Sequence, residues 1–438
     1  SEMCIRDRDS AIYKSRRINL SEKLPKNSVL LIPGANTQYR NADSAYAFRQ
    51  DSNFYYLSGF CEPDSLMAII NNDDGINSII FVPPKDKLKE IWDGHRAGPI
   101  GAAKEFLFDK AYDNSEIDNM MPEILFGCDQ VLYPIGKKNG FDQKVIDWTT
   151  VASSKDRHSK SINILDASST IGNARLIKDD HEISLIKKAC DISAEAHIEA
   201  MKNVKNAESE QSIESLYVYE FSKRGGRFPA YTPIVAGGEN ACVLHYIENN
   251  KKLNKNELLL VDAGCEYEMY ASDITRTYPI SGKFSKEQLE IYKIVLDAMN
   301  AAIDKVKEGN NIMEPQEISE KIITNGLVEL GLLHGDPEDL HKKGAFKDFY
   351  MHKIGHWLGL DVHDAGDYME GDDFMKFKPG MITTIEPGIY ISRSMDVDDK
   401  WKGIGIRIED DILVTKDGNE NLTKKVPSDP AEIESLMS

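Results

Sequence analysis

The segment Met351-His-Lys-Ile-Gly-His-Trp-Leu-Gly-Leu-Asp-Val-His-Asp364 carries three histidines, His352, His356 and His363, within twelve residues. Gly355 and Gly359 interrupt the segment. They argue against one regular helix and allow another stretch of backbone to approach closely. A single histidine here would most simply be an incidental polar residue. Three of them in an otherwise apolar segment indicate a functional site.

Acidic residues occur in equally apolar surroundings elsewhere in the chain. Asp262 ends the run Leu258-Leu-Leu-Val-Asp262, and Asp273 lies eleven residues further on, just before a second β-like run. Two strands joined by the intervening turn would set these two carboxylates side by side. Glu386 ends another β-like run, and Glu409 lies inside an Ile-rich one. An ionised carboxylate in such surroundings is costly unless it is paired or binds a metal, so the four acids together predict a metal site.

These four carboxylates and His356 form a coherent set of metal ligands. Oxygen-rich ligands suit Mn²⁺, Co²⁺ or Fe²⁺ better than a thiolate zinc site would. One divalent ion would leave two negative charges in an enclosed site, whereas two ions would neutralise all four carboxylates. A two-metal site lowers the pKa of its water and holds a tetrahedral intermediate, which predicts a hydrolase. His245, His352 and His363 would then donate to substrate oxygen or relay protons.

Outward from this centre, the chain divides into two domains. Short apolar runs at 29–33, 66–70, 79–82 and 162–165 predict strands that alternate with helices. Further on, Asp179-Asp-His-Glu182 and Ser285-Lys-Glu-Gln288 are typical of helix starts, and the second helix is predicted to end at Gly309. Strands are predicted at 257–263, 275–280, 382–385 and 405–414. We therefore expect a smaller α/β domain at 1–173 and a larger α+β domain at 174–438.

Composition excludes several classes of partner. The 438 residues include 53 Lys and Arg against 72 Asp and Glu, which gives a net charge of −19. Such a surface repels nucleic acid and anionic membranes, and no apolar stretch approaches the ~18 residues that would span a bilayer. Residues 1–9 lack the pattern of a secretory signal. The six scattered cysteines, with no CxxC pair, fit reduced thiols. We expect a cytoplasmic protein without nucleic acid or membrane partners.

The order Asp, Asp, His, Glu, Glu resembles that of the proline-specific aminopeptidase P and prolidase group of the pita-bread metallopeptidases, and the bacterial aminopeptidase P-like members most of all. Five regions carry the match, and a sixth, at 48–60, extends it into the first domain, so that nearly the whole chain after about residue 10 is covered. The five are Ala230-Tyr-Thr-Pro-Ile-Val235 with Leu244-His-Tyr246, Val261-Asp-Ala-Gly-Cys-Glu266 with Ser272-Asp-Ile-Thr-Arg-Thr277, the segment 352–364, Ile385-Glu-Pro-Gly388 and Gly405-Ile-Arg-Ile-Glu-Asp-Asp411. Lys353 departs from the family, which usually has a small residue there.

The resemblance implies a pita-bread fold for the second domain and a creatinase-like α/β fold for the first. It also implies two divalent metal ions, most often Mn²⁺, with Co²⁺, Fe²⁺ or Zn²⁺ as alternatives. Asp262, Asp273 and Glu409 would hold one ion, and His356 and Glu386 would complete the other, with Asp273 and Glu409 bridging the two.

The reaction that the resemblance implies is hydrolysis of the N-terminal Xaa-Pro bond, which releases the first residue of a peptide with proline at its second position. A metal-bridging hydroxide would be the nucleophile and Glu386 the general base. His363 would contact the substrate carbonyl, His245 would assist nearby, His352 would line the proline pocket, and Arg407 would orient the metal carboxylates. Tyr231 is a further substrate-binding candidate.

Trp92, in Ile91-Trp-Asp-Gly-His95, resembles a residue of the first domain that can reach the site of a neighbouring subunit. This resemblance implies a homo-oligomer, a dimer or a tetramer. Simple packing of Trp92 in the core of its own domain is the alternative.

Three other functions compete with this hypothesis. A prolidase restricted to Xaa-Pro dipeptides would use the same metal ligands. A methionine aminopeptidase fits less well, because the long first domain and the histidine spacing are not its pattern. A non-catalytic binding protein on the same fold would have lost ligands, whereas all five are present here.

Overall fold

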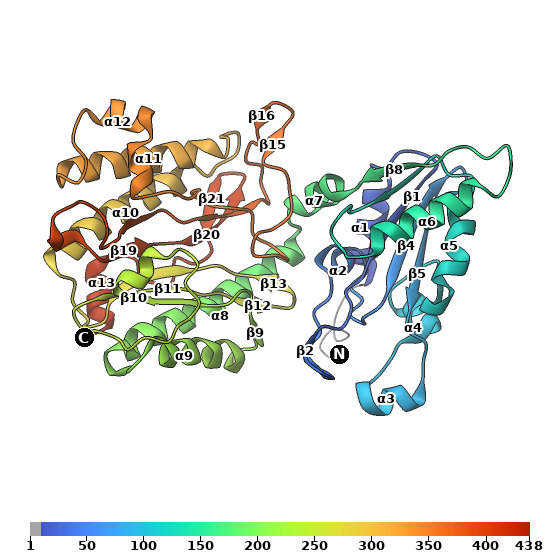
Figure 1. Cartoon of the computed structure of the whole chain (residues 1–438), viewed down its shortest axis with the longest axis horizontal. Coiled ribbons are helices and arrows are strands. Elements are labelled where there is room, and N and C mark those ends of the chain that lie inside the picture. Colours follow the sequence, from blue (N-terminus) through green and yellow to red (C-terminus); the bar gives the residue numbers. More distant parts are fainter. Residues whose placement is uncertain (1–9) are drawn as a thin grey trace. The chain divides into compact units, whose positions relative to one another are not determined.

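The computed structural model describes residues 10–438, which form two compact units divided between Ala174 and Arg175 (Figure 1). Residues 1–9, which include Cys4 and the segment without a signal pattern, lie outside the described residues. No helix among residues 10–438 is long and apolar enough to cross a membrane.

The first unit is built on one mixed six-stranded sheet in the order β6-β5-β4-β1-β7-β8. Its strands are β1 (Ser28–Pro33), β4 (Leu66–Asn72), β5 (Gly75–Val82), β6 (Lys110–Asp113), β7 (Gln130–Tyr133) and β8 (Asn163–Asp166), with a separate pair β2 (Tyr39–Asn41) and β3 (Ser44–Ala45). Strand β1 runs antiparallel to β4 and parallel to β7. The four strands predicted in this region are thus confirmed as β1, β4, β5 and β8, with ends that differ by at most four residues.

Helices accompany this sheet: α1 (Ser10–Ser21), α2 (Ser52–Ser58), α3 (Lys87–Asp93), α4 (Gly98–Glu105), α5 (Ile117–Leu125), α6 (Phe141–Ser153) and α7 (Ser168–Leu176), the last of which includes the boundary between the units. One apolar core joins α5 and α6 to strands β1, β4, β5 and β7. The predicted α/β architecture of this part of the chain is therefore confirmed.

The second unit encloses short strands between two pairs of long helices (Figure 1). Helices α8 (Asp180–Asn203) and α9 (Glu210–Lys223) lie on one side, and α10 (Lys286–Lys305) and α11 (Met313–Glu329) on the other; α12 (Pro337–Lys343) and α13 (Pro430–Leu436) are shorter. The strands are β9 (Phe228–Pro229), β10 (Ile234–Gly237), β11 (Leu258–Asp262), β12 (Cys265–Tyr267), β13 (Tyr270–Ala271), β14 (Thr275–Pro279), β15 (Met369–Glu370), β16 (Asp373–Phe374), β17 (Ile382–Ile385), β18 (Gly388–Ile391), β19 (Ile404–Arg407), β20 (Asp410–Thr415) and β21 (Gly418–Asn421). This is the predicted α+β architecture.

The two predicted helix starts are confirmed at atomic detail. The side chains of Asp179 and Glu182 form a reciprocal capping box at α8, and those of Ser285 and Gln288 form another at α10. The predicted end of α10 at Gly309 is wrong, because the helix ends at Lys305. There the Asn419 side chain donates hydrogen bonds to two backbone carbonyls, those of residues 303 and 306, at 2.8 and 2.9 Å. A capping group from the far end of the chain leaves no local signal in the sequence.

The predicted single strand at 405–414 is also wrong. It is two strands, β19 and β20, that pair with different partners, β18 and β17. Between them the backbone N–H of Glu409 donates to the carbonyl of Thr275 at 3.0 Å. This break places Glu409 beside β14 rather than within a continuous ladder, so an Ile-rich run that reads as one strand serves two sheets.

Candidate metal centre

The histidine segment 351–364 contains no helix, as its glycines predict, and it lies against β17, the strand that directly precedes Glu386. The backbone of Thr384 donates to the carbonyl of His356 at 2.9 Å, and that of Glu386 donates to the carbonyl of Ile354 at 2.7 Å. A Cβ atom on Gly355 would lie 1.8 Å from the carbonyl oxygen of Thr384. Only glycine allows this approach, which brings His356 next to Glu386.

A second glycine contact of the same kind joins the two aspartates. Strands β11 and β14 are antiparallel, with Asp262 opposite Thr275. A Cβ atom on Gly264 would lie 2.0 Å from the carbonyl oxygen of Ser272. The turn between the strands therefore closes tightly, and Asp262 and Asp273 come together as the sequence predicts.

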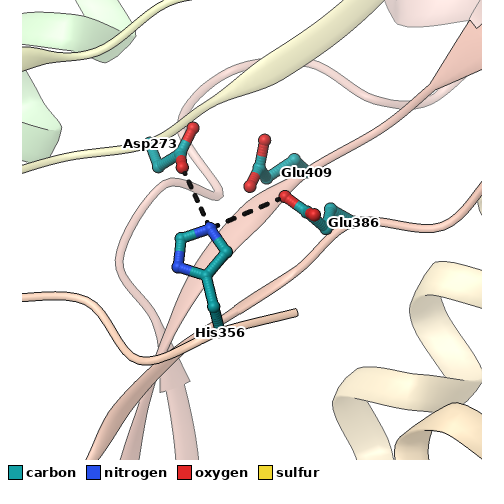
Figure 2. Close-up of side chains that lie close together, drawn as sticks. All are labelled: Asp273, His356, Glu386 and Glu409. Carbon is teal, nitrogen blue, oxygen red and sulfur yellow. Dashed lines mark ion pairs between the residues drawn. The ribbon is translucent and has the colours of Figure 1, made fainter. Parts of the chain in front are cut away.

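Four side chains from distant segments meet at the centre: Asp273, His356, Glu386 and Glu409 (Figure 2). Each offers a ligand atom, and these atoms all lie within 4.8 Å of one another. The Nε2 atom of His356 is 3.3 Å from the carboxylate of Asp273 and 3.9 Å from that of Glu386. The four side chains are thus close enough together to hold a metal ion.

Asp262, the fifth predicted ligand, adjoins the four through hydrogen bonds. The Tyr231 hydroxyl is 2.6 Å from an oxygen of Asp262 and 2.6 Å from an oxygen of Asp273. Arg407 donates to the other oxygen of Asp262 at 3.0 Å. Tyr231, a substrate-binding candidate in the sequence, thus contacts two predicted metal ligands directly.

The electrostatics of the cluster fit divalent cations. Burial, and then the neighbouring Asp273, raise the pKa of Asp262 to about 7. Burial and the same neighbour raise the pKa of Glu409 well above its usual range. One carboxylate oxygen of Glu409 is buried and has no hydrogen-bond partner among residues 10–438. Buried acids crowded in this way are costly without cations, and bound metal ions would supply the missing charge.

The tautomer of His356 also fits a metal ligand. Its Nδ1 atom lies 2.9 Å from the backbone carbonyl of Trp357 and donates to it, which leaves the Nε2 lone pair directed at the carboxylates. Burial opposes the charged imidazolium, but the hydrogen bond to Asp273 and the nearby Glu386 raise the pKa of His356 to about 9 without metal. A bound cation would displace that proton.

The other predicted histidines line a cavity of about 300 Å³ that opens on this centre; they are His245, His352 and His363. The same cavity is lined by Leu244, Val362, Tyr231 and Arg407. The ring of His363 lies 4.4 Å from that of His356, measured between centroids, at 77°. Burial lowers the pKa of His352, and burial followed by the charge of His356 lowers that of His363. Both side chains are therefore neutral near pH 7.

A buried ion cluster fixes the loop that carries Val362 and His363. Asp364 accepts from Lys178 at 2.9 Å and from Arg175 at 2.5 Å, and all three side chains are buried. Breaking such a pair by removing one partner is strongly destabilising. The backbone of Asp364 also donates to the carbonyl of Trp357 at 3.0 Å. Both the side chain and the backbone of Asp364 thus hold the loop next to His363.

Two residues at the site were missed by the sequence analysis. The hydroxyl of Tyr390 contacts His352 at 2.7 Å and accepts from Arg407 at 3.0 Å, which links the histidine to Asp262 through the arginine. Asp411, fully buried, accepts from the backbone N–H of Asp273 at 3.0 Å. Tyr390 has no signal beyond its place in a β-like run. Asp411 could have been identified from the sequence, because burying a carboxylate in an apolar strand carries a free-energy cost that needs an explanation.

Trp92 is on α3 of the first unit, and 87% of its surface is exposed. The alternative that it packs in the core of its own domain is therefore wrong.

Comparisons with known proteins bear on the whole chain. Residues 184–416 match the model of metallopeptidase family M24, and residues 13–133 match that of the aminopeptidase P N-terminal domain. The chain is 42% identical to an Xaa-Pro aminopeptidase of Haemophilus influenzae over 97% of each sequence. A solved variant of Escherichia coli aminopeptidase P superposes with a TM-score of 0.95 at 38% identity, covering 98% of both chains. Pseudomonas aeruginosa aminopeptidase PepP gives 0.94 at 43% identity, covering 99% and 98%.

Proposed function

We propose that this chain, which belongs to metallopeptidase family M24 and joins its pita-bread catalytic domain to an aminopeptidase P N-terminal domain, is an Xaa-Pro aminopeptidase. It would release the first residue of peptides with proline at the second position. The observation that carries the proposal is the cluster of Asp273, His356, Glu386 and Glu409 beside a cavity lined by three further histidines. The two proposed domains, 1–173 and 174–438, are supported by the division between Ala174 and Arg175.

We propose two divalent ions, Mn²⁺ first among the candidates. Asp262, Asp273 and Glu409 would hold one, and His356 and Glu386 would complete the other, with Asp273 and Glu409 shared. When bound, the ions supply charge neutralisation, a more acidic water and polarisation of the scissile carbonyl. Arg407 opposes the rise in the pKa of Asp262 and orients its carboxylate through a hydrogen bond at 3.0 Å.

The residues of the chain itself perform the proton transfers and the positioning. Glu386, which is partly exposed to the cavity, takes a proton from the attacking water and delivers it to the leaving proline nitrogen. His363, neutral near pH 7, donates from its ring nitrogen to the carbonyl oxygen as negative charge develops there. His245 stands on the same cavity wall and assists that role.

Proline sets the remaining requirement, because an Xaa-Pro amide has no N–H. A peptidase that hydrogen-bonds to this N–H cannot bind an Xaa-Pro substrate productively, whereas a site that holds the proline ring can. His352 and the apolar side chains of Leu244 and Val362 line the cavity that would hold the ring. The hydroxyl of Tyr390 fixes the His352 imidazole at 2.7 Å.

The test is release of the first residue from a panel of Xaa-Pro peptides of two to five residues, with and without Mn²⁺. We expect Mn²⁺-dependent cleavage of tripeptides and longer peptides. Turnover of dipeptides alone would favour a prolidase. A protein that contains no metal and leaves every Xaa-Pro peptide intact would instead be a binding protein on the same fold.

We further propose a homo-oligomer in the cytoplasm. Leu88, Ile91 and Trp92 on the short helix α3 are 73%, 76% and 87% exposed, and an apolar surface of this kind is typical of an interface. The structure joins no two of the described cysteines in a disulfide, which supports a reducing compartment. Light scattering of wild type and Trp92→Ala tests the assembly, and a monomeric wild type would contradict it.

A further inference from the structure

A second cavity, of about 470 Å³, reaches the same reacting centre as the first. The two cavities share His356, His363 and Glu386 as wall residues. On the proposed function, the first cavity holds the proline ring and the scissile carbonyl lies at the shared residues. The side chain of the first residue must then extend from the same point into other space, and the second cavity is the space that adjoins it.

The walls of the second cavity are apolar. Among the residues that line it but not the first cavity are Ile312, Met313, Ile354, Trp357, Phe374 and Phe377. Away from the shared residues and Lys353, this surface favours burial of hydrocarbon and compensates poorly for the desolvation of a polar side chain.

The polar groups in these walls are already paired within the protein. Gln316 accepts from the backbone of Ile354 at 2.6 Å and donates to Glu320 at 2.8 Å. The Thr383 hydroxyl donates to the carbonyl of His356 at 3.1 Å, and that of Tyr368 accepts from the backbone of Trp357 at 2.9 Å. A ligand in this cavity therefore finds hydrocarbon and aromatic surface rather than unpaired hydrogen-bonding groups.

Lys353 is the exception on this wall. It is exposed, and its ammonium group forms no ion pair with any residue of the 10–438 range. It is also the position at which the sequence departs from the family. A second cation brought into the same cavity would be repelled by this charge.

We propose that the second cavity receives the side chain of the first residue of the substrate and selects large apolar side chains, and that Lys353 disfavours lysine and arginine there. This specificity rests on the proposed function and adds a substrate class to it. Burying a leucine or phenylalanine side chain against such a surface corresponds to about a 10- to 100-fold gain in kcat/KM over glycine.

The primary experiment measures kcat/KM of the Mn²⁺-loaded full chain on Xaa-Pro-Ala tripeptides, with Gly, Leu, Phe, Met and Lys as the first residue. We expect Leu and Phe to exceed Gly by about 10- to 100-fold. Met and Lys side chains are both unbranched and of similar length, so their comparison isolates charge, and we expect Met to exceed Lys by at least about 10-fold. Equal values for Gly and Leu in an enzyme that cleaves both would overturn the inference and leave the proposed function standing.

Two variants on one hairpin test the wall itself. Phe374 lines the cavity, is 45% exposed and contributes little to the core, so Phe374→Ala should fold and lower the Leu-to-Gly ratio by about 3- to 10-fold. Met369, which lies on the paired strand and is 42% exposed, is not among the lining residues. Met369→Ala should leave the ratio unchanged. An equal effect of Phe374→Ala on all substrates would overturn the assignment of the wall.

A third variant tests the charge. Lys353→Gly restores the small residue usual in the family and should raise the Lys-to-Met ratio by about 10-fold. Because both substrates are measured on the same variant, any effect on the neighbouring His352 cancels in the ratio. An unchanged ratio would overturn the role of Lys353. Failure of every variant and of the wild type to cleave any tripeptide would contradict the proposed function instead.

Discussion

At the scale of single residues, Glu386 combines two roles in the proposed function, metal ligand and proton carrier. Glu386→Ala should abolish turnover and deplete at least one metal ion, because it removes both the proposed acceptor of the water proton and a proposed ligand. Metal analysis and peptide cleavage on the same preparation check this. Glu308→Ala, at an exposed glutamate before the turn at Gly309, is the control and should behave as wild type. Near wild-type activity of Glu386→Ala would refute the assignment.

Arg407 acts through two directed hydrogen bonds, to Asp262 at 3.0 Å and to Tyr390 at 3.0 Å. A lysine keeps the charge but lacks the planar fork that reaches both partners. We expect Arg407→Lys to lower kcat about 10- to 100-fold and to weaken metal binding. Tyr390→Phe, which removes one of these two bonds, should have the smaller effect. Full activity of the Arg407→Lys variant would show that only the positive charge is needed at this position.

The meeting of the acidic residues could be predicted from sequence because each carboxylate ends or interrupts an apolar run, and the cost of burying it is visible in the run itself. Tyr390 could not be found in this way. A tyrosine in a strand is ordinary, and its partners His352 and Arg407 stand 38 and 17 residues away in the chain. The role of the Tyr390 hydroxyl depends on the two partners that the fold places beside it.

At the scale of elements, His197 links helix α8 to the end of β11. Its Nε2 donates to the carbonyl of Ala263 at 2.9 Å, and its Nδ1 accepts from the Tyr217 hydroxyl at 2.8 Å. Burial lowers the pKa of His197 to about 3. The neutral ring is thus part of the packing beside a predicted metal ligand.

This lowered pKa predicts a loss of stability in acid. The unfolded chain takes up a proton near the usual histidine pKa of about 6.5, whereas the folded chain does so only near 3. The contribution of His197 is therefore complete above pH 6.5 and falls by about 1.4 kcal/mol per pH unit between these values. His197→Gln can make both hydrogen bonds without titrating. Between pH 3 and 6.5, the unfolding free energy of this variant should fall less steeply with falling pH than that of wild type, by the contribution of one proton. Identical slopes for the two proteins would contradict the assignment.

Gly355 joins the histidine segment to β17 through contact of one backbone with another. Gly355→Ala should destabilise the protein by about 3 kcal/mol, because the added Cβ meets a carbonyl oxygen at 1.8 Å and the segments must part. Activity should fall with it, since His356 and Glu386 move apart. Denaturant unfolding measures the first effect. Gly237→Ala, where the nearest atom lies at 3.4 Å, is the matched control and should cost little.

Elements with local signals were predictable, and elements set by distant contacts were not. The capping boxes of α8 and α10 lie within four consecutive residues and identified both helix starts. The end of α10 depends on Asn419, and the break at Glu409 depends on β14. Neither partner is near in sequence, so the run at 405–414 could only be read as one strand.

At the scale of the whole molecule, metal binding should couple to stability. The native chain gathers the carboxylates and the unfolded chain does not, so ions that bind the native state alone stabilise it, by about 2.7 kcal/mol at one hundred times their Kd. We expect chelation to lower the melting temperature and abolish activity, and Mn²⁺ to restore both. Calorimetry with and without chelator measures the shift. A melting temperature that is insensitive to chelator and Mn²⁺ would contradict the proposed site.

The two glycine contacts, Gly264 against Ser272 and Gly355 against Thr384, have a consequence for evolutionary drift. Each fixes the spacing of one pair of proposed ligands through main-chain distances, which do not depend on which side chains fill the surrounding core. Escherichia coli aminopeptidase P differs at most positions, with 38% identity, yet keeps the same fold at a TM-score of 0.95. Substitutions can therefore accumulate around the site, and a designer could reshape the two cavities while the spacing of the proposed ligands stays the same.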